Sequence, residues 1–465
     1  VWISRRRELT MLADIKEGIL ARTQSMGRSI RRHEGHGKQD LHGHARSVDI
    51  PAQRTHHAGR HQRGATLIKQ DIRPGASIFL GTTTNGRPQP VFWDSHTPII
   101  NNFPPGALIT GAPGSGKTNL GLTLAGINTI LGKITVILDP KGDFIGLKGI
   151  EDQIGKFRYL DLARGKPGIL DPFYMAIEFS DKVDLAIQVI DIFTGGLSGD
   201  ELTALAPIIK DTARDRNPSL QKVVDMLRSS EKPEARNLGT HLDLLRELPF
   251  AKLCFAPGTS RREPIKINEG LTVFTLVGLQ LPQSGTRPSE MKNKEKLASG
   301  IMFLLTDFLR RIMEDNTSGN PKTVIIDEAH AVVGNSAGAE VVRSMAKLGR
   351  SKYLSLILIS QAMADLELLD IKNTISTRFA FRSDRDEATK IIESMNLPSD
   401  EGFEDIIVDM EVGECLMQDF QGRYSTMKVS QWKKDWADVF SSNPLDVLKR
   451  KNNQRRYSQQ SQKGQ

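Results

Sequence analysis

Cysteine is scarce in this chain. Its 465 residues include two cysteines, Cys254 and Cys415, which lie far apart in the sequence. So few thiols exclude a disulfide framework and argue against a cysteine-based metal centre. They are typical of a reducing compartment, and we therefore predict a cytoplasmic protein.

Long apolar runs are also missing. No uninterrupted run approaches the roughly 18 residues of a membrane span, and the most apolar helix candidate, residues 297–313, contains three charged side chains. The arginines at 5–7 are followed by acidic residues instead of an apolar core, so we expect no signal peptide. We predict no intrinsic transmembrane segment, with peripheral association at the cytoplasmic membrane as an option. The first residue is Val, which leaves open an alternative start codon or a fragment that lacks an upstream domain.

Acidic residues are scarce at both ends of the chain. Residues 1–63 contain 13 Lys or Arg against 6 Asp or Glu, and residues 449–465 contain 6 Lys or Arg and no acid. The net charges are thus +7 for residues 1–63 and +6 for residues 449–465. Since the whole chain carries +8, residues 64–448 carry −5. Basic tails can hold phosphates or anionic lipids, but for either tail alone a solvated, disordered end is the favoured explanation.

The first 66 residues form a basic segment of low complexity. Seven of the ten histidines fall among its glycines and arginines, namely His33, His36, His42, His44, His56, His57 and His61. Metal binding is one reading of this composition, but no Cys or regular acidic partner accompanies the histidines. We predict a disordered segment.

One stretch organises the rest of the chain. Residues 111–118, Gly-Ala-Pro-Gly-Ser-Gly-Lys-Thr, fit the phosphate-binding pattern G-x-x-x-x-G-K-[ST] between an apolar strand and a helix. Glycines let backbone N–H groups turn toward a phosphate, and the helix N-terminus adds partial positive charge. Lys117 is expected at the β- and γ-phosphates and Thr118 at Mg²⁺. The predicted ATP-binding residues are Gly111, Ala112, Pro113, Gly114, Ser115, Gly116, Lys117, Thr118 and Asn119.

A second signature ends the segment 321–330, Pro-Lys-Thr-Val-Ile-Ile-Asp-Glu-Ala-His. Its β-branched run leads into Asp327 and Glu328. Asp327 is expected to hold Mg²⁺ through water, and Glu328 to polarise the attacking water, because phosphoryl transfer needs a positioned nucleophile and neutralised charge. An apolar run before acids is weak evidence alone, and the phosphate loop upstream strengthens it.

Further strand-like and helix-like segments alternate along the chain. A hairpin is expected at 77–93, with Asn85-Gly86 at its turn. Buried strands are expected at 133–138, 157–160, 271–276, 353–359 and 376–381, and a strand pair at 413–418 and 423–429. Helical spacing over 176–250 indicates an inserted subdomain.

These elements predict an α/β fold with a mostly parallel central sheet, divided into five segments. The segments are a basic N-terminal segment at 1–66, two parts of one ATPase domain at 67–174 and 261–445, a helical insertion at 175–260 between them, and a basic disordered tail at 446–465.

Polar residues follow two of the expected strands. Asp139, Lys141 and Asp143 come directly after 133–138, where either a role near the nucleotide or simple turn chemistry explains them. Gln361 follows 353–359 and is a candidate for sensing the γ-phosphate or orienting the water.

Two arginines on one expected helix are candidates for action on a neighbouring subunit's nucleotide. Arg350 stands after a glycine just before the strand at 353–359, and Arg343 lies two helical turns earlier. A solvated helix face explains Arg343 better than such a role does.

Together these residues resemble the HerA/FtsK superfamily of P-loop motors, and within it the VirB/TraC-type ATPases of conjugative type IV secretion. The resemblance spans roughly residues 75–445. It is carried by Gly111–Thr118, Leu138-Asp-Pro-Lys-Gly-Asp-Phe144, Ile325-Ile-Asp-Glu-Ala-His330, Gly349-Arg350 eleven residues before Gln361, Gly413-Glu-Cys-Leu416 and Gly422-Arg-Tyr424. Two features depart from it: a short basic segment stands where a large N-terminal domain is usual, and His330 stands where a bulky aromatic residue is common.

The resemblance implies a RecA-like sheet, a hexameric ring, and ATP hydrolysis with Mg²⁺ at subunit boundaries, where Arg350 would act in trans beside Glu328, Lys117 and Gln361. The implied function is a motor that moves DNA or protein through secretion or conjugation machinery at the inner face of the membrane. Two alternatives stay open. One is a double-stranded DNA translocase or helicase of the same superfamily, which the basic tails favour mildly. The other is a non-hydrolysing nucleotide-dependent scaffold, against which Glu328 argues.

Overall fold

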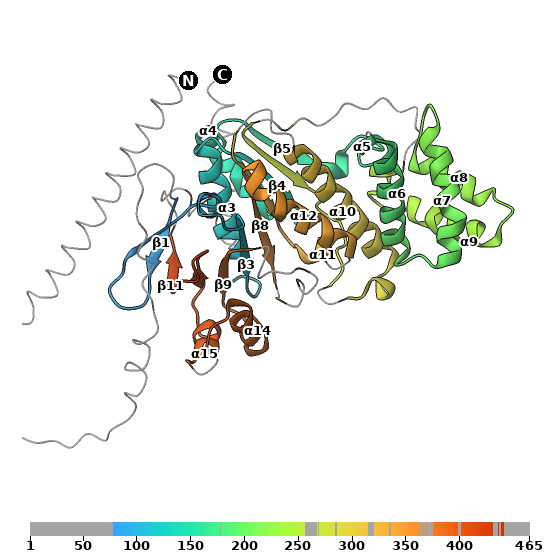
Figure 1. The fold of residues 1–465 in the computed structure, drawn as a ribbon. Helices are drawn as coiled ribbons and strands as arrows, with labels where there is room; N and C mark the ends of the chain where they lie inside the picture. The colour runs from blue at the N-terminus through green and yellow to red at the C-terminus, as the bar shows by residue number, and fades with distance from the viewer. Residues whose placement is uncertain are drawn as a thin grey trace, which may run out of the picture. The chain divides into compact units, whose positions relative to one another are not determined.

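A single eleven-stranded sheet dominates the computed structural model (Figure 1). The structure describes residues 78–430, together with 436, 439 and 440, apart from gaps at 177, 256–266, 268, 284–285, 315–319, 334–335, 362, 364–365, 367–368, 370–374 and 399–400. The predictions made for the histidine-rich segment 1–66 and for the tail 446–465 lie outside these residues.

The strands are β1 (Ile78–Thr83), β2 (Pro90–Trp93), β3 (Gly106–Thr110), β4 (Ile134–Asp139), β5 (Phe157–Asp161), β6 (Leu271–Thr275), β7 (Lys322–Ile326), β8 (Leu354–Ser360), β9 (Thr377–Phe381), β10 (Glu414–Gln418) and β11 (Tyr424–Val429). Their order across the sheet is β2-β1-β11-β10-β9-β3-β8-β7-β4-β6-β5. The run from β9 to β5 is parallel, and β10, β11, β1 and β2 extend it in antiparallel pairing. The predicted α/β class with a mostly parallel sheet is confirmed.

The parallel strands are buried on both faces because their apolar residues alternate between two cores. On β3, Leu108 belongs to one core and Ile109 to the other. Helix α3 (Lys117–Ile130), η1 (Asp143–Ile150) and α4 (Glu151–Ile154) contribute to the core that contains Ile109. Helices α10 (Asn293–Glu314) and α12 (Ser336–Lys352) contribute to the other. Covering both faces is the usual arrangement of a parallel sheet.

Four longer helices interrupt the sheet between β5 and β6. They are α6 (Phe179–Thr194), α7 (Gly199–Arg214), α8 (Leu220–Arg228) and α9 (Pro233–Arg246). Helix α6 packs on α10 (Figure 1). The buried leucines of these helices belong to the same core as Leu108. The chain thus inserts helices here, as the helical spacing predicted, while the predicted boundaries of the five segments remain predictions.

Shorter elements complete the described part of the chain. They are α2 (Thr97–Ile100), η2 (Leu162–Arg164), α5 (Pro172–Met175), η3 (Ala251–Leu253), η4 (Pro288–Glu290), α11 (His330–Val333), α14 (Arg385–Met395) and α15 (Phe403–Val408). None of the helices in this part is both long and apolar enough to cross a bilayer.

Candidate active site

Four neighbouring strands bring the site together. Strands β3, β8, β7 and β4 are adjacent and parallel, so their carboxyl ends meet at one edge of the sheet. The phosphate loop follows β3, Gln361 follows β8, and Asp327 follows β7, while Asp139 ends β4. Such an edge is where ligands bind in open parallel sheets.

The phosphate loop depends on its glycines. Gly111, Gly114 and Gly116 have φ values of 147°, 74° and 115°, which L side chains rarely adopt. A Cβ at Gly111 would lie 2.7 Å from the Cβ of Phe381, and one at Gly116 would lie 3.0 Å from the Cα of Gly413. A Cβ at Gly114 would meet no atom within 4 Å, so this glycine is required by its backbone angle.

Two segments far away in sequence hold this loop in place. The N–H of Ala112 donates to the carbonyl of Arg382 at 2.8 Å, and the N–H of Gly413 donates to the carbonyl of Ser115 at 2.8 Å. Sequence reasoning missed Arg382 entirely, and it noted Gly413 only as the start of an expected strand and within the family resemblance. No local signal identifies either contact, because each depends on where β9 and β10 lie.

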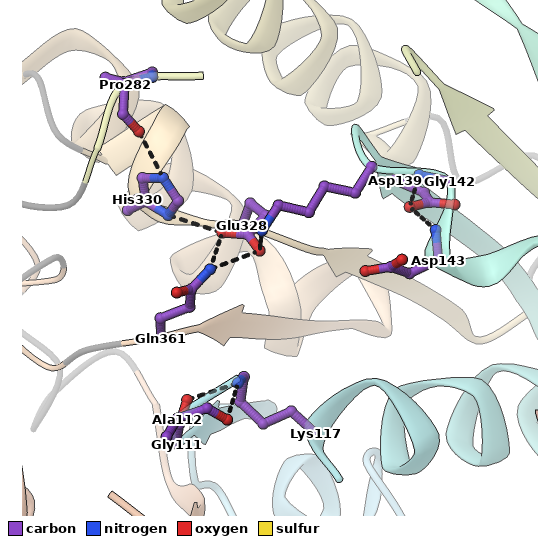
Figure 2. Close-up of polar contacts among 11 residues, drawn as sticks. Gly111, Ala112, Lys117, Asp139, Gly142, Asp143, Pro282, Glu328, His330 and Gln361 are labelled. Carbon is purple, nitrogen blue, oxygen red and sulfur yellow. Dashed lines mark hydrogen bonds and ion pairs between the residues drawn. The ribbon is translucent and has the colours of Figure 1, made fainter. Parts of the chain in front are cut away.

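Lys117 is the first residue of α3 and turns back toward its own loop. Its Nζ donates to the carbonyl oxygens of Gly111 at 2.6 Å and Ala112 at 2.9 Å (Figure 2). Burial lowers the pKa of Lys117, whereas the nearby Glu328 and Asp327 act in the opposite direction. The ammonium is therefore poised beside both the loop and the acids.

Asp327 is buried beside this lysine. Burial, followed by the neighbouring charge of Glu328, raises the pKa of Asp327 well above its usual range. Within the described residues its Oδ2 atom has no hydrogen-bond partner, and neither does the hydroxyl of Ser115 in the phosphate loop. A buried carboxylate oxygen without a partner is costly, and a cation would relieve that cost.

Glu328 is held from several sides at once. Its φ of 51° lies in the left-handed region, a strain of about 1–3 kcal/mol that other contacts must offset. The Nε2 of Gln361 donates to both carboxylate oxygens at 3.1 Å, and the Nδ1 of His330 lies 3.2 Å from Oε2. The ring of His330 is fixed in turn by a 3.1 Å contact between Nε2 and the carbonyl of Pro282 (Figure 2). The ammonium of Lys141 forms an ion pair with Oε1.

The turn after β4 is built on Asp139. The carboxylate of this buried residue accepts from the N–H groups of Gly142 at 2.8 Å, Asp143 at 2.9 Å and Phe144 at 2.9 Å. Burial raises the pKa of Asp139 to about 6, and these hydrogen bonds oppose the rise. Asp139 therefore serves the turn, while Lys141 reaches the site. The turn explanation thus accounts for Asp139, while a role of Lys141 near the nucleotide stays a prediction.

The residues at this edge fit ATP with Mg²⁺. No group of three or more His, Cys, Asp or Glu side chains in the described part of the chain could enclose a metal ion. Mg²⁺ in phosphoryl-transfer sites needs no such group, because substrate phosphates and water supply most of its ligands. Thr118 and Asp327 remain the proposed contributors from the protein, and the unpartnered Oδ2 of Asp327 is the observation that supports this.

The two arginines lie apart from this site. Arg350 lies in the last turn of α12, and its Nη1 donates to the carbonyl of Asn102 at 3.1 Å, at the edge where β3 and β8 begin. Arg343 lies earlier on α12 and forms an ion pair with Glu340 at 2.9 Å. The structure thus brings together Lys117, Asp327, Glu328 and Gln361, but neither Arg350 nor Arg343.

Fold and site together define a P-loop nucleotide-binding protein, and comparison with known proteins gives its family. A family model described as an AAA-like domain matches residues 101–440. The chain belongs to this family of AAA-like P-loop NTPases.

Solved structures share the fold at low sequence identity. VirB4 of Thermoanaerobacter pseudethanolicus has 17% identity and a TM-score of 0.62, covering 78% of this chain and 98% of its own. The bacterial conjugative coupling protein TrwB has 14% identity and a TM-score of 0.50, covering 75% and 88%. A second TrwB structure, in complex with the ATP analogue ADPNP, has 15% identity and a TM-score of 0.50, covering 71% and 86%. The predicted resemblance is confirmed at the level of the fold, and the family shown is that of the AAA-like domain.

One curated relative also matches. It is the uncharacterized protein YddE of Bacillus subtilis (strain 168), 22% identical over 360 residues, or 73% of this chain. The chain spans 43% of the length of that protein.

Proposed function

We propose that this chain is an ATP-hydrolysing motor of a conjugative or type IV secretion-like system that transfers DNA or protein. One observation carries the proposal. Glu328 lies at the end of β7, held by the Gln361 amide at 3.1 Å and within electrostatic reach of Lys117, in a fold shared with VirB4 and TrwB. A nucleotide switch that only binds needs no carboxylate at this position.

The chemistry assigned to the site follows from its geometry. Lys117 would leave the loop carbonyls and contact the β- and γ-phosphates, while Thr118 and Asp327 would hold Mg²⁺. Glu328 would orient and deprotonate water, and Gln361 would fix its carboxylate. Positioning and neutralisation of charge supply most of the rate acceleration in phosphoryl transfer.

The position of Arg350 supports a shared site. In one copy Arg350 lies at the opposite end of β3 from the phosphate loop, so it would act on the nucleotide of a neighbouring copy. We propose a homo-hexameric ring, formed in the cytoplasm beside secretion or conjugation machinery at the inner face of the membrane. Head-to-tail contacts close into rings when the rotation between subunits closes.

The test is the ATPase rate measured against protein concentration, with and without double-stranded DNA, alongside native mass. A rate per subunit that rises with assembly supports the shared site. A rate that DNA does not change supports a secretion ATPase, whereas strong stimulation by DNA supports the translocase alternative. Nucleotide binding without any hydrolysis, at all concentrations, would leave the scaffold alternative and overturn the motor.

A further inference from the structure

Lys141 lies on the turn after β4, and its side chain reaches Glu328 in the site. Asp139 fixes this turn, because its carboxylate accepts hydrogen bonds from three backbone N–H groups of the turn. The turn is also packed from the side, because a Cβ on Gly142 would lie 2.7 Å from a methyl group of Val277. The long side chain of Lys141 is thus carried on a rigid base.

This lysine closes over the buried Glu328. The Lys141 side chain is 46% exposed, whereas that of Glu328 is 8% exposed. Its charge also acts on Lys117 and Asp143, since Lys141 is among the causes that lower the pKa of Lys117 and oppose the rise in the pKa of Asp143. Two ammonium groups, Lys117 and Lys141, therefore share the space in front of the carboxylates.

With this arrangement Oε1 of Glu328 has both of its acceptor sites occupied. Lys141 and Gln361 engage Oε1 and Gln361 also engages Oε2, while the Nδ1 of His330 lies 3.2 Å from Oε2 without a hydrogen bond between these two atoms. One of the two contacts at Oε1 has to break before Oε1 can accept from a water. Lys141 is the most exposed partner, and its flexible stem can reorient.

We propose that Lys141 is a second phosphate lysine that reads the γ-phosphate. Without a γ-phosphate it pairs with Glu328, and with ATP it moves to the γ-phosphate oxygens and releases the carboxylate for water. The attraction is physical: the terminal phosphate of ATP carries more charge than one carboxylate, and charge-assisted hydrogen bonds to phosphate are strong. This inference rests on the proposed function and assigns the residue that couples nucleotide state to Glu328.

The proposal is tested by binding, without turnover. Affinities of the full chain for ADP and for a non-hydrolysable ATP analogue, both with Mg²⁺, are measured by equilibrium titration. Lys141→Gln is expected to weaken the binding of the ATP analogue by about tenfold or more and to leave the affinity for ADP unchanged. The reason is that a charge-assisted contact is lost in one complex only. Lys141→Arg keeps the charge and should restore most of the difference.

A matched control is available on α14. Lys390 has the same exposed fraction as Lys141, 46%, and pairs with Glu387, whose side chain is 16% exposed. Lys390→Gln should change neither affinity. An equal loss of both nucleotides in Lys141→Gln would mean that Lys141 only supports the loop, and an unchanged analogue affinity would exclude a phosphate contact. Either result overturns the proposal.

Removing the partner carboxylate gives a second, independent readout. In Glu328→Gln the ammonium of Lys141 loses its ion pair, so the ATP analogue should bind more tightly than in wild type. That gain should vanish in the double variant Lys141→Gln/Glu328→Gln, as a double-mutant cycle shows for coupled residues. A gain that persists in the double variant contradicts the switch. If the wild type never hydrolyses ATP while Lys141→Gln still weakens binding of the analogue alone, the motor is contradicted and the Lys141 contact is supported.

Discussion

The guanidinium of Arg350 donates a 3.1 Å hydrogen bond to the carbonyl of Asn102, just before β3, whereas Lys117 follows the phosphate loop at the other end of that strand. The two cations that the family resemblance assigns to one nucleotide therefore lie at opposite edges of the sheet. They can act on the same ATP only if they come from two copies of the chain.

A mixing experiment tests this relationship. Arg350→Ala and Lys117→Ala are each expected to lose ATPase activity, Arg350→Ala by about 10³-fold or more. Mixed at equal concentration, subunits should pair so that about a quarter of the interfaces combine an intact loop with an intact arginine, and activity returns in part. The measurement is phosphate release before and after mixing, with native mass as the check on assembly.

Arg343→Ala serves as the control in the same assay. Arg343 is on the same helix and paired with Glu340, so its loss should leave the rate close to wild type. If the mixture of Arg350→Ala and Lys117→Ala stays inactive while the variants still assemble, Arg350 does not act in trans.

Glu328→Gln separates binding from hydrolysis. The amide keeps the size of the side chain and can still accept from Gln361, but it cannot take a proton from water. We expect the rate of phosphate release to fall by about 10²–10⁴-fold while ATP still binds. Glu340→Gln, at an exposed carboxylate on α12, is the matched change and should have no effect. An unchanged rate in Glu328→Gln would remove Glu328 from the chemistry.

Much of this arrangement could be predicted from the sequence, since its information is local. The β-branched runs and glycine pattern indicated where strands and the phosphate loop lie, and parallel pairing brought Gln361 beside Glu328 as strand ends require. What could not be predicted depends on tertiary contacts. The left-handed backbone of Glu328 breaks the local preference of glutamate, and it persists because side chains from β8 and from the turn after β4 hold it.

Asp139→Asn tests whether the turn after β4 depends on a carboxylate. Asp139 accepts from three backbone N–H groups through both oxygens, and asparagine offers one oxygen and a competing N–H donor. At least one buried N–H would lose its acceptor, so we expect a loss of about 1–3 kcal/mol in the free energy of unfolding, measured by urea denaturation at pH 7. Asp161→Asn, at the N-cap of η2 where one N–H is capped, is the milder comparison. Equal stability of Asp139→Asn and wild type would contradict this account of the turn.

His96 lies at the opposite edge of the sheet, and we predict that it makes the stability of the protein depend on pH. This buried imidazole, 7% exposed, contacts the carbonyl of Lys322 through Nε2 at 3.0 Å and the hydroxyl of Ser95 through Nδ1 at 2.9 Å. A neutral ring satisfies both, with Nε2 donating and Nδ1 accepting. Burial, and then the charge of Lys133, lowers the pKa of His96 to about 4.

Because the folded pKa lies below that of the unfolded chain, the unfolded state binds more protons as the pH falls below about 6.5. Because of His96, the free energy of unfolding should thus fall by about 2 kcal/mol between pH 7 and pH 5. The check is the free energy of unfolding at both pH values in wild type and in His96→Gln, with His241→Gln on α9 as the control. The free energy of unfolding lost between pH 7 and pH 5 should be larger in wild type than in His96→Gln by this amount. It should be the same in wild type and in His241→Gln. Parallel pH profiles for wild type and His96→Gln would show that His96 is not held neutral in the folded protein.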